Sequence, residues 1–311
     1  MAPSDAAPSE AAPQPGKPNP GGPNPGGPNP DRDSRVRIGI LATCFNRCSV
    51  TLQALDALRA AVDPAAVRYH VYLVDDGSTD GTGDAVRAGY PEATVIQGDG
   101  SLFWNQGMRR SWQAAMADRP DYYLWLNDDL QLLPGSLDHL LAVQRREEAL
   151  HGPRVITVGK TTDARTGETT YGGYRRKGRV SRLNFRLLEP GESECDTMNG
   201  NCVLIPGAAA DEVGIHAERF SHGFGDIEYG LRAAKRGYRI VEDPEPVGHT
   251  DFNHAYLEKT SRLGPRNARF ILTHPKGLPP GEVLWLCRQH GGWIWPANFV
   301  LRYLKILSWK A

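Results

Sequence analysis

The first half of the chain alternates short apolar runs with segments of helical character. The apolar runs are rich in Val, Ile, Leu and aromatic residues, as strands are, and they occupy residues 36–42, 70–75, 93–97 and 122–127. Between them the sequence predicts helices over about residues 50–62, after Asp80, and over about 106–117. Strands separated by helices of this length form right-handed crossovers. The pattern therefore predicts an α/β fold with a mostly parallel sheet flanked by helices.

Two of the predicted strands end in carboxylates. The run "HVYLVD" ends in Asp75 and Asp76 before a Gly-Ser turn, and "YYLWL" is followed by Asn127, Asp128 and Asp129. Asn and Asp are common turn residues, so each end taken alone could be a solvated loop. In a parallel sheet, however, the carboxyl ends of the strands share one edge, where ligands bind. We expect the two strands to be adjacent and their acids to form a binding site.

The second half of the chain is less regular. Residues 160–195 are rich in Gly, Thr and Arg, which predicts a long loop or hairpin over the site. "CVLIP" predicts a further strand, and "DIEYGLRAAKRGY" predicts a helix that stops at Gly237. In that helix Ile227, Leu231 and Ala234 recur at i, i+4 and i+7, which is the spacing of one helical face.

The two ends of the chain differ from the middle in composition. Residues 1–34 consist mainly of Pro, Gly, Ala, Ser and Asn, and they predict a disordered tail. Residues 257–311 contain nine Lys or Arg against two Glu. Within them "ANFVLRYLKILSWK" has an apolar face interrupted by Lys and Arg, which is typical of a helix lying on a membrane surface. The alternative is a helix packed on the domain or against a second subunit of a homodimer.

Composition and charge exclude several classes of protein. The 36 basic residues balance the 36 acidic ones, so we expect no nucleic-acid partner. The five cysteines are scattered and lack the paired spacing of a zinc site, which fits a reducing cytoplasm. No apolar run approaches the length of about 18 residues that a membrane span needs, and the N-terminus has no secretory-signal pattern. We therefore expect a cytoplasmic protein that is at most peripheral at the inner face of the membrane.

The predicted acidic edge suits a divalent cation. Mg²⁺ and Mn²⁺ take oxygen ligands, commonly one or two carboxylates completed by phosphates and water. A cation is also a direct way for a chain with no net charge to hold a diphosphate. We therefore expect Mn²⁺ or Mg²⁺ as cofactor, neutralising the charge on a departing diphosphate.

Four motifs in order resemble the family-2 glycosyltransferases, inverting nucleotide-sugar enzymes of the GT-A fold. They are "ATCFNR" after the first strand, "VDDGSTDGT" after the second, "NDD" after the fourth and "GDIEYGLRAAKRGY" later. The resemblance implies a Rossmann-like GT-A domain over residues 35–255, with a nucleotide-binding half (35–130) and an acceptor half (131–255). Residues 256–311 then form a basic, aromatic, C-terminal helical extension.

The resemblance also implies roles for residues of the nucleotide-binding half. Thr43 and Asn46 would line the nucleotide pocket, and Asp76 would hydrogen-bond the base. Trp104 and Met108 lie in the family's donor-contacting segment, although both could equally be core residues. The full set of expected nucleotide and donor contacts is Thr43, Asn46, Arg47, Asp75, Asp76, Trp104, Asn105, Arg109, Asn127 and Asp128.

The metal ligands follow from the same resemblance. The family carries a D-x-D motif where this chain has Asn127, Asp128 and Asp129. Because Asn replaces the first acid, we assign the metal to Asp129 and the ribose or sugar to Asp128. His249 lies where many of these enzymes place a third metal ligand, and a hydrogen-bonded structural histidine is the alternative.

The resemblance assigns the catalytic base to Asp226. It matches the acid of the family's E-D-x-D-L-x-x-R pattern that deprotonates the acceptor hydroxyl, with Gly225 in place of the preceding Glu. Asp226 and Glu228 point to nearly opposite sides of a helix, so only one of them can face a cleft. Glu228 has an alternative partner in Arg232, at i+4. The alternative for Asp226 is a carboxylate that stabilises a helix N-terminus.

These features predict a metal-dependent inverting glycosyltransferase. It would move a hexosyl or deoxyhexosyl group from a UDP- or dTDP-sugar to a hydroxyl of a glycan, lipid-linked or small-molecule acceptor. A nucleotidyltransferase of similar topology would need a Gly-rich phosphate loop with a basic residue after the first strand, which "ATCFNRCS" lacks. A non-catalytic sugar- or nucleotide-binding scaffold of the same fold is the other alternative, and Asn127 and Gly225 favour it.

Overall fold

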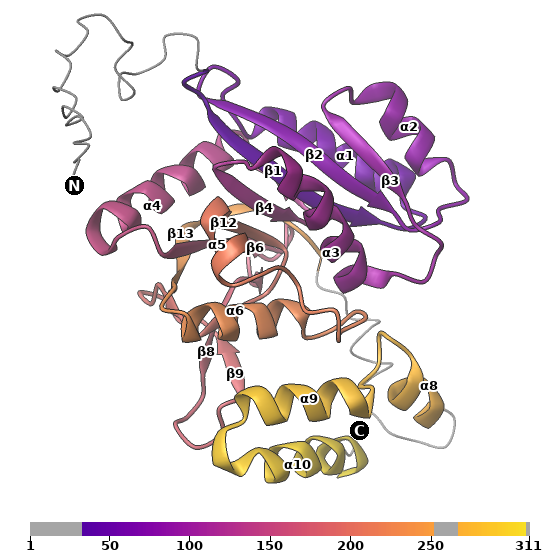
Figure 1. Ribbon diagram of the computed structural model, residues 1–311, viewed down its shortest axis with the longest axis vertical. Helices are drawn as coiled ribbons and strands as arrows, with labels where there is room; N and C mark the ends of the chain where they lie inside the picture. The colour runs from indigo at the N-terminus through magenta and orange to yellow at the C-terminus, as the bar shows by residue number, and fades with distance from the viewer. Residues whose placement is uncertain (1–32, 252–266, 309–311) are drawn as a thin grey trace, which may run out of the picture. The chain divides into compact units, whose positions relative to one another are not determined.

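A mixed sheet of ten strands forms the core of the molecule (Figure 1). The computed structural model describes residues 33–251 and 267–308, and the residues from Arg35 onward form one compact unit. The predicted disordered tail, residues 1–34, lies almost entirely outside the described residues. The main path of the sheet is β10 (Glu194–Cys195), β13 (Arg239–His249), β6 (Val155–Thr162), β12 (Cys202–Pro206), β4 (Tyr122–Leu126), β1 (Val36–Cys44), β2 (Val67–Asp75) and β3 (Ala93–Gln97).

The N-terminal half of the sheet is parallel and contains the four predicted strands. β1 pairs in parallel with β2 and β4, and β2 pairs in parallel with β3. The strands that end near Asp76 and Asp129 were predicted to be adjacent. That prediction is wrong, because β1 lies between them. After the edge strand β3 the chain crosses back over β1 to its other side. This reversal of strand order lies between β1 and β4, and α/β sheets bind ligands outside the carboxyl ends of the strands at such a point. That edge of the sheet is called here the crevice.

The second half of the sheet is mixed. β12 runs antiparallel to both β4 and β6, whereas β6 and β13 are parallel. Residues 160–195 contain short strands: β7 (Thr169–Tyr171) extends the main sheet, and β8 (Gly173–Arg176) and β9 (Phe185–Leu187) form a hairpin. That hairpin joins β11 (Thr197–Met198) in a separate three-stranded sheet. The short strand β5 (Gln131–Leu132) pairs with the end of β13.

Helices cover both faces of the main sheet, as predicted. The helices on one face are α1 (Cys48–Ala60), α2 (Thr82–Gly89) and α4 (Ser136–His151), and those on the other are α3 (Phe103–Ala115), α5 (Gly207–Glu212) and α6 (Gly225–Lys235). Leu58 and Leu140 belong to the apolar core of the first face, and Trp112 and Tyr229 to that of the second. A 3₁₀ turn, η1 (Met116–Asp118), follows α3.

The helix α6 ends as predicted and is covered on two sides. Gly237 has a φ of 84°, and its N–H bonds to the carbonyl of Ala234, as expected for a glycine that stops a helix. Tyr229 packs on the sheet, whereas Ile227 and Leu231 pack on the C-terminal helices. Ala234, the third residue of the recurrence, is exposed, so that face is only partly buried. The reason is that α6 lies between two layers and buries two stripes of side chains instead of one.

The C-terminal helical extension is confirmed as a further layer outside α6. It consists of α8 (Ala268–Thr273), α9 (Pro280–His290), the 3₁₀ turn η2 (Gly292–Ile294) and α10 (Trp295–Ser308). Val283 and Leu286 of α9 share an apolar cluster with Phe220 and Leu231. Among the described residues, no helix is both long enough and apolar enough to cross a membrane.

Candidate active site

The loops after β1, β2 and β4 bring carboxylates together at the crevice. The pKa of Cys44, the last residue of β1, is evidence for this arrangement. Burial raises the pKa of its thiol, and the charges of Asp128, Asp75 and Asp80 raise it further. Asp128 follows β4, whereas the other two acids belong to the end of β2 and its loop. Acids from both sides of β1 therefore lie around its carboxyl end.

One arginine holds both carboxylates that follow β4. Arg47 Nη1 lies 2.7 Å from Asp129 Oδ2 and 3.2 Å from Asp128 Oδ1. Burial raises the pKa of Asp128 to about 6, although Arg47 acts to lower it and Asp129 to raise it. Two adjacent carboxylates that share one guanidinium are a pair of oxygen donors that a divalent cation can also use.

The donor set fits a cation whose remaining ligands come from a substrate. Within residues 33–251 and 267–308, no three His, Cys, Asp or Glu side chains are grouped as metal ligands. His249 pairs through its backbone with Gln131, two residues beyond Asp129. Its Nδ1 lies 3.0 Å from Thr162 Oγ1, which leaves Nε2 as the ring nitrogen available to a metal. Mg²⁺ and Mn²⁺ sites that use one or two carboxylates plus phosphates need no larger protein cage.

The acids after β2 are held by backbone groups. Asp76 is buried, and its carboxylate accepts hydrogen bonds from backbone N–H groups between Gly100 and Phe103. Asp75 is also buried and accepts the N–H of Ser78 at 3.0 Å. Asp76 therefore shapes the segment that leads into α3, and its contact with a nucleotide base stays a prediction.

The two residues expected to line the nucleotide pocket differ in accessibility. Thr43 is buried beneath Gly107, where an added Cβ would overlap the Thr43 hydroxyl. Asn46 is exposed in the loop after β1. Its Oδ1 accepts the N–H of Thr79 at 2.7 Å, and its own N–H donates to Ser78 Oγ at 2.9 Å. Asn46 thus ties the loop after β1 to the loop after β2.

Two predicted donor contacts on α3 anchor a loop. Asn105 Nδ2 donates to the carbonyl oxygens of Ala217 and Phe220, at 2.9 and 2.6 Å. Arg109 Nη1 donates to the carbonyl oxygen of His216 at 2.7 Å. These bonds hold the segment that precedes α6 against α3, and none of them involves the carboxylates at the crevice.

Trp104 links the two sides of the crevice. Its Nε1 donates to Asn127 Oδ1 at 2.8 Å. Its ring packs against Gly200 so closely that an added Cβ there would overlap the ring and also meet Asp226. Trp104 remains partly exposed, whereas Met108 is fully buried and belongs to the core. Asn127, at the first position of the family's D-x-D, therefore holds Trp104 in place.

Asp226 is held near the N-terminus of α6 by hydrogen-bond donors. Its Oδ2 accepts the N–H of Gly200 at 3.0 Å and the Nδ2 of Asn199 at 3.3 Å, and its Oδ1 accepts the N–H of Ile227 at 2.7 Å. Burial raises the pKa of Asp226, although the backbone N–H groups act to lower it. A carboxylate with a raised pKa is a stronger proton acceptor than an ordinary aspartate, as a general base requires.

Glu228 points away from this site, as the helical geometry predicted. It is 1% exposed and lies 3.0 Å from Arg232 Nη2 and 3.4 Å from His290 Nε2. Burial acts to raise its pKa, but hydrogen bonds from His290 and Arg232 outweigh burial and lower it. The predicted i, i+4 pair is therefore present and also joins α6 to α9.

Residues 199–201 belong to the site but were not identified from the sequence. Gly200 and Asn199 of this segment donate to Asp226. In addition, the carbonyl oxygen of Asn201 accepts the N–H of Asn127, with an N–O distance of 3.0 Å. It precedes β12, and Cys202 pairs with Leu126 in the antiparallel register. The start of an antiparallel strand lies beside the end of its neighbour. The motif "NGN" before "CVLIP" was the available signal, but it has meaning only once that pairing is known.

Gly225 replaces the family's Glu for a packing reason. A Cβ at position 225 would overlap Oδ1 of Asn105. The glycine therefore allows α6 to begin directly against α3. Asn127 and Gly225 were the residues that favoured a non-catalytic scaffold. Each of them has a structural role beside the crevice, which accounts for its departure from the family pattern.

Three residues at the crevice have strained backbone conformations. Among the described residues, the non-glycine residues with positive φ are Asn46 (52°), Phe103 (54°), Arg119 (44°) and Phe224 (65°). Asn46 precedes Arg47, Phe103 precedes Trp104, and Phe224 is the N-cap of α6. Non-glycine residues rarely adopt such φ values, and they cluster at functional sites.

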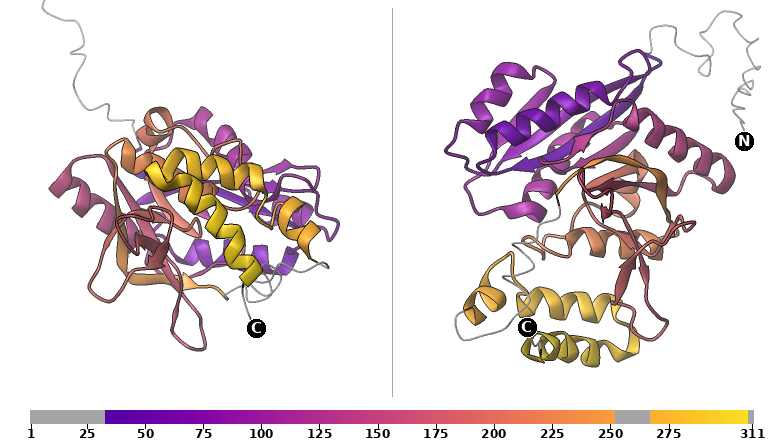
Figure 2. Two further views of the ribbon diagram at one scale, coloured as in Figure 1. Left: turned by 90° about the horizontal axis from the view of Figure 1, so that it is seen from below. Right: turned by 180° about the vertical axis from the view of Figure 1, so that it is seen from behind.

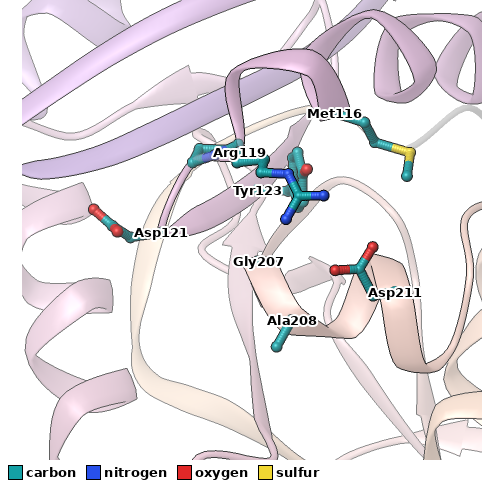
Figure 3. Close-up of a pocket in the computed structure, with 8 residues that line it drawn as sticks. Met116, Arg119, Asp121, Tyr123, Gly207, Ala208 and Asp211 are labelled. Carbon is teal, nitrogen blue, oxygen red and sulfur yellow. The ribbon is translucent and has the colours of Figure 1, made fainter.

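A cavity of 310 Å³ lies at the other end of β4 and is a separate feature (Figure 3). It is lined by residues before and at the start of β4 and by residues of α5, and the side chains of Arg119 and Asp211 flank it. It contains none of the predicted site residues. The crevice at the carboxyl ends of the strands, which carries the acids, is the candidate active site.

Comparison with protein families and curated proteins gives two matches that bear on function. A family model described as Glycosyl transferase family 2 matches residues 40–200. An N-acetylglucosaminyl-diphospho-decaprenol L-rhamnosyltransferase of Mycobacterium tuberculosis is 26% identical over 263 residues, covering 75% of this chain and 79% of the relative.

Comparison with solved structures gives likenesses of fold. Mannosyltransferase PcManGT from Pyrobaculum calidifontis, in complex with GDP-Man and Mn²⁺, has a TM-score of 0.51 at 15% identity, covering 89% of this chain and 82% of that one. S. aureus TarS in complex with UDP-GlcNAc has a TM-score of 0.56 at 13% identity, covering 88% and 74%. At these identities the likeness bears on the fold alone.

Proposed function

This chain belongs to glycosyltransferase family 2 and has the GT-A fold, and from that premise we propose that it is a metal-dependent, inverting enzyme with a lipid-linked acceptor. It moves a hexosyl or deoxyhexosyl group from a UDP- or dTDP-sugar to a hydroxyl of a glycan carried on a lipid diphosphate. The relative named for rhamnosyl transfer to N-acetylglucosaminyl-diphospho-decaprenol supports this acceptor class. Such an acceptor is reached at a membrane surface, so peripheral contact on the cytoplasmic side through residues 256–311 is part of the proposal.

In the proposed reaction Asp226 is the general base. Its carboxylate takes the proton of the acceptor hydroxyl as that oxygen attacks the anomeric carbon. The bond from this carbon to the diphosphate oxygen breaks on the opposite face, and the nucleoside diphosphate leaves with the electron pair. One substitution from the opposite face inverts the configuration at the anomeric carbon.

The contacts from Asp226 through Gly200 and Trp104 to Asn127 are the observation that carries this proposal. They hold the base in a fixed relation to Asp128 and Asp129, which directly follow Asn127. A single displacement needs a fixed distance between the base and the leaving-group site. The reason is that the base takes the acceptor's proton while the diphosphate leaves the donor in the same step.

The acids after β4 form the leaving-group side. Asp129, with His249, would hold the Mn²⁺ or Mg²⁺, whose chemistry is to neutralise the charge that develops on the diphosphate. Asp128 would hydrogen-bond the ribose or the donor sugar. Arg47, which pairs with both acids, would add a positive charge on this side of the site.

The direct test uses the full chain, a panel of UDP- and dTDP-sugars and a polyprenyl-diphosphate-linked glycan. We expect release of nucleoside diphosphate that needs Mn²⁺ or Mg²⁺ and stops when EDTA is added. NMR of the product should show the anomeric configuration opposite to that of the donor. Turnover that persists after chelation would disprove the metal requirement, and a retained configuration would disprove the single displacement.

A further inference from the structure

The outward face of α10 is apolar over its described side chains. Trp293, just before the helix, is 85% exposed, and Val300, Leu301 and Leu304 are 52%, 52% and 49% exposed. The other exposed side chains from Trp295 to Leu304 are Pro296 and Ala297, which are also apolar. A helix that faces water normally presents charged and polar residues, and a contiguous exposed apolar patch marks an interaction site.

The inner face of α10 already has its partners. Trp295, Phe299 and Tyr303 pack against the apolar cluster that contains Leu286. Arg302 is also turned inward, because its guanidinium lies over the ring of Phe224 and donates to a backbone carbonyl. The exposed apolar face is therefore additional to the packing that holds α10 on the protein.

A basic hairpin tip lies beside this apolar face. In the turn between β8 and β9, Lys177, Arg179 and Arg182 are exposed and have no ion pair among the described residues, and Val180 is 65% exposed. Figure 1 shows the hairpin reaching the layer of α9 and α10, and Figure 2 shows the same arrangement from behind.

Specific contacts join the hairpin tip to α10. Ser181 Oγ lies 3.2 Å from Asn298 Oδ1, and Arg302 Nη2 lies 3.4 Å from the carbonyl oxygen of Leu183. The side chain of Arg182 packs against Gly292. The exposed face of α10 with Trp293 and the tip Lys177–Arg182 thus form one surface, called here the C-terminal surface. Its described side chains include cations and apolar groups but no acid.

We propose that the C-terminal surface docks on an anionic lipid bilayer. Trp293, Val300, Leu301 and Leu304 would enter the boundary between headgroups and acyl chains, and the cations of the hairpin tip would pair with lipid phosphates. This combination of apolar and basic groups is the one that interfacial helices use. The proposed contact is peripheral, because α10 would lie along the surface of the bilayer.

A bilayer fits this surface better than a second copy of the chain does. A symmetric dimer repeats the same patch on both subunits. It would bring two sets of the tip cations, Lys177, Arg179 and Arg182, into one interface whose described side chains offer no acid to pair them. An anionic bilayer supplies the missing negative charge.

The proposed docking has a biological purpose only if the proposed transfer reaction is correct, and the structure links the two. The hairpin that ends in the basic tip carries Tyr174, whose pKa is raised by burial and by the charge of Asp226. The hairpin therefore spans from the neighbourhood of the proposed base to the surface that meets the lipid. Binding to vesicles itself requires no donor, acceptor or metal.

The test is co-sedimentation of the full chain with vesicles of phosphatidylcholine, with and without about 30% phosphatidylglycerol. We expect binding to the anionic vesicles that weakens as salt is raised from about 0.05 to about 0.5 M. Leu301→Glu with Leu304→Glu should weaken binding at least about tenfold, and Lys177→Glu with Arg179→Glu should weaken it and reduce its salt dependence. Leu150→Glu is the matched control, because Leu150 is a 67% exposed leucine on α4 and its substitution should change nothing.

Three results would overturn the proposal. They are no binding of the wild-type chain to anionic vesicles, equal binding by the Leu301→Glu, Leu304→Glu variant, or a dimer in sedimentation velocity that this variant dissociates without any effect on vesicles. Thermal shift with UDP and Mn²⁺ should be the same for all variants. Loss of vesicle binding with an intact thermal shift therefore concerns the C-terminal surface, and failure of sugar transfer alone concerns the proposed function.

Discussion

Asp226 has an environment that suits the proposed general base, since the residue is half-buried and its carboxylate accepts backbone N–H groups from Gly200 and Ile227. Because its pKa is raised, it becomes protonated at a higher pH than an ordinary aspartate as the pH falls. A protonated base cannot accept the acceptor's proton. We therefore expect kcat to decline on the acid side with an apparent pKa above the ordinary value of about 3.9.

Asp226→Asn should lower kcat by about 10²- to 10⁴-fold, because the amide cannot take a proton. Asn keeps an oxygen that can accept the N–H of Gly200, so nucleotide binding measured by thermal shift should not change. A variant that keeps its rate would show that another group is the base.

At Asn127 we expect substitution by aspartate to have little effect on metal binding. Asn127 Oδ1 already accepts the Trp104 N–H, and a carboxylate oxygen at the same position would accept it equally. Calorimetry with Mn²⁺ in the presence of UDP should give affinities for Asn127→Asp within about threefold of the wild type. Asn127→Leu should weaken nucleotide binding, since Trp104 loses its partner. A large gain in Mn²⁺ affinity for Asn127→Asp would mean that this position can ligate the metal.

Gly225 should resist even the smallest substitution. Gly225→Ala places a Cβ on Asn105 Oδ1, and overpacking of this kind costs about 1–3 kcal/mol. Gly223→Ala is the control, because a Cβ there meets no atom within 4 Å. Denaturation midpoints should fall for position 225 only. Measured against Asn105→Gly alone, Gly225→Ala should cost less than it does in the wild type, because the overlapping side chain is then absent. Equal effects at positions 223 and 225 would contradict the packing account.

At the scale of elements, α6 joins the sheet, the proposed base and the C-terminal layer. Its N-terminal turn holds Asp226, its inner stripe contains Tyr229, and its outer stripe contains Leu231. Glu228 links it to α9 through His290. The position of Asp226 therefore depends on two packing surfaces and one buried ion-pair network.

Breaking that network should be costly. Glu228→Gln leaves Arg232 with a buried neutral partner, and loss of one member of a buried pair costs about 3–5 kcal/mol. The folded pKa of Glu228 is lowered, so its contribution to stability is present above the ordinary Glu pKa and is lost as the pH falls below it. The difference in urea denaturation between variant and wild type should therefore shrink at low pH.

The control for this element is an exposed pair. Asp84 of α2 is 90% exposed and lies 2.8 Å from Arg87. Asp84→Asn should change stability by no more than about 1 kcal/mol, as expected for surface ion pairs. Equal losses at Asp84 and Glu228 would show that the burial of Glu228 does not matter.

At the scale of the whole molecule, the C-terminal helices complete the core. Deleting residues 280–311 uncovers Phe220 and Leu231 and removes the buried Val283 and Leu286. Each such side chain contributes about 1.5–3 kcal/mol, and each kcal/mol corresponds to about 2–4 °C in a chain of this size. We expect calorimetry to show a Tm lower by about 10 °C or more. An unchanged Tm would make residues 256–311 a separable domain, as the sequence-based boundary at residue 255 allows.

The sequence by itself determined the strands and helices of the parallel half, the family and the acidic ends of β2 and β4. Apolar runs, turn residues and motifs are local properties of the chain, so they can be recognised without knowledge of the fold. The α/β sheet flanked by helices and the C-terminal helical extension were predicted correctly for the same reason, and the parallel pairing is continuous in the N-terminal half of the sheet. The individual site residues were named through resemblance, and their roles in catalysis stay predictions.

Only the tertiary structure decided how these segments meet. It placed β1 between the two acidic strand ends, paired Arg47 with Asp128 and Asp129, and brought residues 199–201 to Asp226 through the antiparallel β12. It also covered α6 on two sides and left one face of α10 apolar and open. These features depend on strand order, register and packing between segments far apart in the chain. Local patterns do not contain that information, because it arises when distant surfaces compete for burial.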